Sequence, residues 1–158
     1  YLKKLYKNSM EVEVIDNFLK KEEFFTLKDN IYQKQEKNFP WYFQQNRTYP
    51  GDNGKQFTHL FYSQSKVNST HFDILYPILN KLNVFALRKI KANLTMPDKE
   101  FKPLQFHTDF AINHPAAKTG IFYINNTNGP TVFENRKTID CVENRMVIFP
   151  SNISRMSE

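Results

Sequence analysis

The stretch "LRKIKANL", Leu87 to Leu94, marks the point at which the pattern of the chain changes. Before it, apolar residues recur mainly at helical spacing. Within it they alternate, with Ile90, Ala92 and Leu94 on one side and polar residues between them. Alternation with a period of two is typical of a half-buried β-strand. The chain is therefore predicted to have helices before this stretch and strands after it.

The first predicted helix follows a short strand near the N-terminus. "EVEVI", residues 11–15, alternates like a strand. Asp16 or Asn17 can then accept hydrogen bonds from the first turn of a helix that runs to about Gln35. Residues 38–57 are rich in turn residues with embedded aromatics, and are expected to form a long loop with short strands.

A second helix is predicted over residues 68–83, "NSTHFDILYPILNKLN". Thr70 and Asp73 have the spacing of a capping box, and the apolar residues of this stretch fall on one side of a helix. Pro77 lies inside the stretch and is expected to kink or shorten the helix, because proline has no N–H to donate.

Several short strands are expected after the change of pattern, separated by Pro, Gly and Asn turns. They cover residues 104–109, 118–125, 131–134, 137–142 and 145–150. Two helices followed by many short strands indicate an α+β protein, with a double-sheet jelly-roll core and the N-terminal helices packed outside it. A length of 158 residues suits one compact domain.

Composition and charge limit the classes of function. Hydrophobic residues make up 40% of the chain, with 15 Phe and 8 Tyr, so an aromatic-rich core is expected rather than disorder. The net charge is +6, but the basic residues are scattered, which permits nucleic-acid binding without favouring it. The single cysteine, Cys141, suits a reducing compartment. With no apolar stretch near the roughly 18 residues of a membrane span and no signal-peptide pattern, a cytoplasmic protein without membrane contact is expected.

His107 and Asp109, in "LQFHTDFAI", are the candidate catalytic and metal-binding residues. Residues i and i+2 of a strand project to the same face, so the imidazole and the carboxylate are expected side by side. Non-haem Fe(II) oxygenases bind iron through two histidines and one carboxylate, and this pair would supply two of those ligands. By itself, the spacing fits a His–Asp hydrogen bond at a strand end equally well.

From Arg88 onward the chain resembles the Fe(II)/2-oxoglutarate-dependent dioxygenases, especially their prolyl-hydroxylase-like branch. The matching stretches are "RKIKANL", "FHTDF", "KTGIFYINNTNGPTVFENR" and "NRMVIFPSN", in the family's order. "VIDNFL" near the start is similar to the family's entry into its first helix. The resemblance implies the double-stranded β-helix form of the jelly roll, Fe(II) as the metal, and 2-oxoglutarate and O₂ as cosubstrates.

The resemblance also assigns roles to residues. It makes His107 and Asp109 metal ligands, and it makes Tyr123 the tyrosine that reaches the far carboxylate of 2-oxoglutarate. Thr119, four residues before Tyr123 on the same strand face, is expected to line the same site. A tyrosine in a half-buried strand is also compatible with plain packing.

The third iron ligand is missing from its expected place. In the family a second histidine follows "FPS" by a few residues, at the start of the next strand, and here that position holds Arg155. A guanidinium stays protonated and offers no lone pair to a metal. The chain also stops at Glu158, before the strand on which the family carries a basic residue for the distal carboxylate of 2-oxoglutarate. A single domain, 1–158, without its last strand is therefore expected, with an exposed strand edge.

Three explanations stay open. The chain can be incomplete after Glu158, it can be a degenerate homologue that keeps the fold and has lost iron, or Arg155 can anchor the cosubstrate beside a two-ligand metal site. The first is preferred, because one cause then accounts for most of the absences.

The function implied by the resemblance is an oxygenase that hydroxylates a C–H bond of a protein or small-molecule substrate. The alternative is a catalytically inactive jelly-roll binding module that has lost the distal iron ligand. A metal enzyme with other ligands would need a further His or Glu near the site, and His114 is the nearby candidate. His59 and His71 match no ligand position and are expected to be surface or packing residues.

Overall fold

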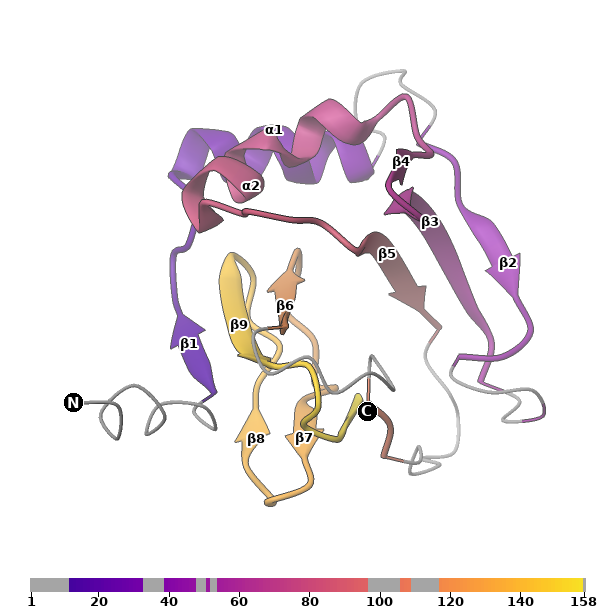
Figure 1. Cartoon of the computed structure of the whole chain (residues 1–158), viewed down its shortest axis with the longest axis vertical. Helices are drawn as coiled ribbons and strands as arrows, with labels where there is room; N and C mark the ends of the chain where they lie inside the picture. The colour runs from indigo at the N-terminus through magenta and orange to yellow at the C-terminus, as the bar shows by residue number, and fades with distance from the viewer. Residues whose placement is uncertain are drawn as a thin grey trace. The chain divides into compact units, whose positions relative to one another are not determined.

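The computed structural model describes residues 12–32, 39–47, 51, 54–96, 106–108 and 117–157. It shows an α+β protein whose strands pair antiparallel, with two α-helices and one 3₁₀-helix in the described part (Figure 1). The chain divides into two compact units: residues 1–18 with 101–158, called here the C-terminal unit, and residues 19–100, called the middle unit. Each is described by itself.

The C-terminal unit contains two antiparallel sheets of three strands. The first sheet has the order β1-β9-β6 and the second β10-β7-β8. The strands are β1 (Glu13–Ile15), β6 (Lys118–Tyr123), β7 (Thr131–Phe133), β8 (Thr138–Ile139), β9 (Arg145–Pro150) and β10 (Arg155–Ser157). In Figure 1, β1 (indigo) lies beside β9 (yellow), so the two ends of the chain meet in one sheet. From β6 onward the chain passes from the first sheet to the second, back to the first with β9, and again to the second with β10.

The inner faces of the two sheets share one apolar cluster. Its buried members come from both sheets and the segments beside them: Val12, Tyr123, Phe133, Ile139, Val147 and Phe149. The rings of Phe133 and Phe149, one from each sheet, meet edge to face with centroids 5.0 Å apart. This aromatic contact joins the sheets through buried apolar surface, as the Phe-rich composition predicts.

The middle unit is built around one long strand. Its elements are α1 (Lys21–Ile31), β2 (Tyr42–Gln44), β3 (Gln56–Ser63), β4 (Lys66–Val67), η2 (Phe72–Leu75), α2 (Tyr76–Leu82) and β5 (Lys89–Thr95). β5 pairs along the whole of β3, while β2 and β4 pair with its two ends. Helix α1 buries Phe24, Leu27 and Ile31, which are spaced as one apolar face of a helix.

The first helix begins four residues later than the sequence predicts. Asp16 and Asn17 do not cap it. The Asp16 carboxylate is bound by Arg145, and Asn17 has a left-handed φ of 50°. The helix starts at Lys21, where the Glu23 side chain accepts a hydrogen bond from the Lys20 N–H at 3.2 Å. A long-range ion pair therefore takes the carboxylate that local spacing assigns to the cap.

The second predicted helix is divided into two pieces. A 3₁₀ turn, η2, precedes α2, and neither has a side-chain cap, so the capping box of Thr70 and Asp73 is wrong. Ser69 instead accepts a hydrogen bond from the His71 N–H at 3.0 Å. Pro77 lies in the first turn of α2, where its missing N–H needs no partner, and so begins the helix rather than kinking it.

The predicted strands of the C-terminal half are confirmed where the structure describes them. β5 lies at residues 89–95, and β6, β7, β8 and β9 fall inside the predicted ranges. Of the predicted strand at 104–109, the described part is 106–108, and its pairing belongs to the site below. In the predicted loop at 38–57 the structure places β2 and the first residues of β3.

Candidate functional site

His107 and Arg155 lie directly opposite each other on neighbouring strands. The His107 N–H donates to the Arg155 carbonyl at 3.0 Å, and the Arg155 N–H donates to the His107 carbonyl at 3.0 Å. The pair is an isolated antiparallel bridge at the first residue of β10. Directly opposed residues of an antiparallel pair carry their side chains on the same face. The imidazole of His107 and the guanidinium of Arg155 are therefore close neighbours.

The shared face is the inner one. Arg155 is also directly opposite Phe133, whose side chain is fully buried in the cluster between the sheets. Its guanidinium carbon lies 5.7 Å from the ring centroid of Phe149, which belongs to the first sheet. A cation over an aromatic face is an attractive arrangement. His107, Arg155 and Phe133 thus form a row across three strands that faces the first sheet.

Tyr123 and Thr119 project from the first sheet toward the same interior. Tyr123 is 9% exposed, and its hydroxyl lies 2.7 Å from the Thr131 hydroxyl of β7. Burial raises the pKa of Tyr123, an effect that the hydrogen bond to Thr131 opposes. Thr119 is paired with Phe149, and its hydroxyl donates to Ser151 Oγ at 3.0 Å. Both hydroxyls expected to serve a ligand have protein partners here.

The structure thus places four of the five predicted site residues: His107, Arg155, Thr119 and Tyr123 have side chains directed between the two sheets. Asp109 lies outside the described residues, as does His114. The residues that the structure describes contain no group of three His, Cys, Asp or Glu that could hold a metal ion.

The described side chains do not fit an iron centre with three protein ligands. His107 offers a nitrogen lone pair, but the residue facing it across the bridge is an arginine. A guanidinium is a donor without an acceptor atom, and its positive charge opposes a divalent cation nearby. No catalytic step through iron is therefore derived for this chain.

His59 forms a buried polar network in the middle unit that sequence reasoning left as surface or packing. It is 3% exposed, its Nδ1 lies 2.6 Å from the Pro40 carbonyl oxygen, and its Nε2 lies 2.7 Å from Ser69 Oγ. The carbonyl can only accept, so Nδ1 carries the proton. Burial lowers the pKa of His59, while the bond to Pro40 opposes that change. With both ring nitrogens occupied and the Phe39 ring 4.2 Å away, His59 is a structural residue.

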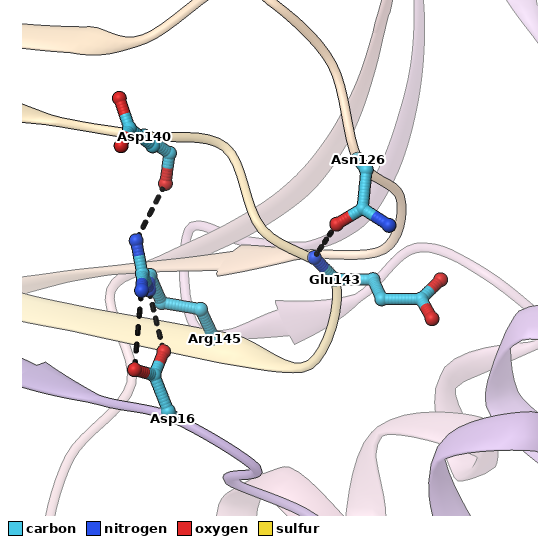
Figure 2. Close-up of polar contacts among 5 residues, drawn as sticks. All are labelled: Asp16, Asn126, Asp140, Glu143 and Arg145. Carbon is cyan, nitrogen blue, oxygen red and sulfur yellow. Dashed lines mark hydrogen bonds and ion pairs between the residues drawn. The ribbon is translucent and has the colours of Figure 1, made fainter.

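A second polar group fastens β1 to the start of β9 (Figure 2). Arg145 Nε and Nη2 bond the two carboxylate oxygens of Asp16 at 2.6 and 3.1 Å, and Nη1 donates to the Asp140 carbonyl at 3.1 Å. The hydrogen bond from Arg145 lowers the pKa of Asp16. Close by, the Glu143 N–H donates to Asn126 Oδ1 at 2.9 Å. Every side chain of this group bonds another, so it serves structure.

No helix among the described residues is long and apolar enough to cross a membrane. Comparison with known proteins leaves the chain unassigned: no family model matches it, and neither does any curated protein.

Proposed function

We propose that the C-terminal unit is the jelly-roll core of the Fe(II)/2-oxoglutarate oxygenase lineage, with Arg155 in the place of the third iron ligand. The path of the chain supports this. In a jelly roll, strands that follow one another wrap around a core shared by two sheets. Here β7 and β8 lie in one sheet, β9 in the other and β10 again in the first of these.

The position of His107 is the single observation that carries the proposal. The H-x-D strand and the strand after "FPS" are far apart in sequence, and the resemblance requires them to meet so that their ligands can share a metal. In this chain the two meet residue for residue, since His107 bridges Arg155 at the first residue of β10. A chance occurrence of "HTD" would not lead to this register.

By lineage, the function is that of a 2-oxoglutarate- and O₂-dependent oxygenase acting on a C–H bond of a protein or small molecule. His107 and Asp109 would hold Fe(II), which supplies the oxidising chemistry when bound. The chain's own contribution is an interior closed by aromatic side chains, with Tyr123 and Thr119 directed into it.

A catalytically inactive binding module of the same fold is the second candidate. Arg155 favours it, because a guanidinium opposite His107 removes a ligand and adds a positive charge where a cation would bind. This candidate keeps the lineage and gives up the reaction.

An anaerobic titration with Fe(II) and 2-oxoglutarate tests the proposal, through the visible charge-transfer band of the iron–cosubstrate complex. We expect no band from the unchanged chain and a band from Arg155→His, which is lost again when His107→Ala or Asp109→Ala is added. A band in the unchanged chain that needs His107 would make it a working oxygenase site. A folded Arg155→His variant without a band would overturn the lineage.

A further inference from the structure

The side chains around Arg155 form a set of hydrogen-bond donors. The guanidinium has only donors, and the His107 imidazole beside it can donate through a ring nitrogen. Thr119 pairs with Phe149, the residue over whose ring Arg155 lies, and Thr119 donates its hydroxyl to Ser151. Ser151 is 3% exposed. A cation with neutral donors beside it is suited to an anion, not to a metal ion.

Arg155 is held in a way that suits recognition of a carboxylate. Its backbone N–H and carbonyl are both bonded to His107, and its guanidinium rests on the buried Phe149 ring. These contacts restrict the side chain before any ligand arrives, so less conformational entropy is lost on binding. A planar guanidinium pairs with a carboxylate through two parallel hydrogen bonds, and its several N–H groups can serve a ligand together with another acceptor.

We infer that the His107–Arg155 pair forms a metal-independent binding site for a small carboxylate, in the place where the oxygenase lineage holds iron. The inference rests on the proposed jelly-roll register, and it names the ligand class of that site. Arg155 supplies the charge, His107 a second donor on the same face, and Phe149 the apolar floor. The ligand carboxylate takes the role that the metal has in the lineage, as the charge that the interior is built to hold.

Isothermal titration calorimetry in EDTA at low ionic strength tests the inference, with succinate as the probe and the neutral succinamide as its control. We expect the unchanged chain to bind succinate and not succinamide. Arg155→Gln is expected to weaken succinate binding by about tenfold or more, the usual loss for a hydrogen bond to a charged group. Arg136→Gln removes the same charge from an exposed turn of the same unit, and is expected to leave binding unchanged.

Equal binding of succinate and succinamide, no binding by the folded unchanged chain, or full binding by Arg155→Gln would each overturn the inference. The comparison of the two probes needs no variant, so it holds even if Arg155→Gln fails to fold. Arg155→His separates this inference from the lineage. If it gains Fe(II)-dependent binding of 2-oxoglutarate while the unchanged chain ignores succinate, the lineage stands and the carboxylate site does not. Succinate binding by the unchanged chain with no metal gained by Arg155→His gives the reverse.

Discussion

Replacing Tyr123 by phenylalanine should destabilise the C-terminal unit through one hydrogen bond. The Tyr123 and Thr131 hydroxyls lie 2.7 Å apart, and the two residues are 9% and 2% exposed. Tyr123→Phe removes one partner and leaves the Thr131 hydroxyl buried without it. A buried polar group that loses its partner costs about 1–3 kcal/mol. The free energy of unfolding should fall by about that amount.

A double-mutant cycle separates this bond from ordinary packing. Thr131→Val keeps the side-chain shape and removes the hydroxyl, so it should cost about 1–3 kcal/mol for the same reason. With both changes together, no hydroxyl is left without its partner. The double variant should therefore lose less than the sum of the single losses, with a coupling of about 1 kcal/mol or more.

Urea unfolding followed by circular dichroism measures the cycle, provided that the slope of free energy against denaturant stays the same among the variants. Losses that add to within about 0.3–0.5 kcal/mol would refute the reasoning, because independent sites behave in that way. The same Tyr123→Phe variant tests the role implied by the family resemblance. If Tyr123 serves a ligand carboxylate, the variant weakens succinate or 2-oxoglutarate binding beyond the change that Thr131→Val causes.

Three further predictions concern packing and pH. Phe133→Ala empties a fully buried position against Phe149 and should cost about 3–5 kcal/mol, measured by the same unfolding assay; a loss below about 1 kcal/mol would contradict the described core. Asp16 has a lowered pKa beside Arg145, so its ion pair stabilises the fold above about pH 4 and is lost as pH falls through the folded pKa; because the Asp16 side chain is 56% exposed, Asp16→Asn should cost only about 0–1 kcal/mol at neutral pH, and a cost that persists at about pH 2 would exclude the ion pair as its cause. His59 has a pKa lowered by burial, so its contribution is complete above about pH 6.5 and is lost as pH falls toward the folded value; urea midpoints at about pH 7.5 and 5.5 should fall further for the unchanged chain than for His59→Gln, and equal falls would show that another group titrates.

Local signals sufficed for the strands of the C-terminal half. Alternation of apolar and polar residues, with turn residues between the runs, located β5 to β9, because a half-buried strand needs this alternation whatever lies across from it. The helix starts were predicted less well. Asp16 has the chemistry of a helix cap, yet its partner is Arg145, 129 residues away, and no local rule includes that distance.

The site shows the same division. The sequence by itself determined which side chains are available: one imidazole in an H-x-D motif, an arginine after "FPS", and Tyr123 and Thr119 on one strand face. It could not determine that Tyr123 bonds Thr131, or that both nitrogens of His59 are bonded, since these partners come from other strands and loops. Only the tertiary structure decided that His107 and Arg155 stand opposite each other with Phe149 beneath the guanidinium. The physical reason is that strand register and sheet packing depend on contacts between segments distant in sequence, whereas alternation and residue chemistry are properties of the segment itself.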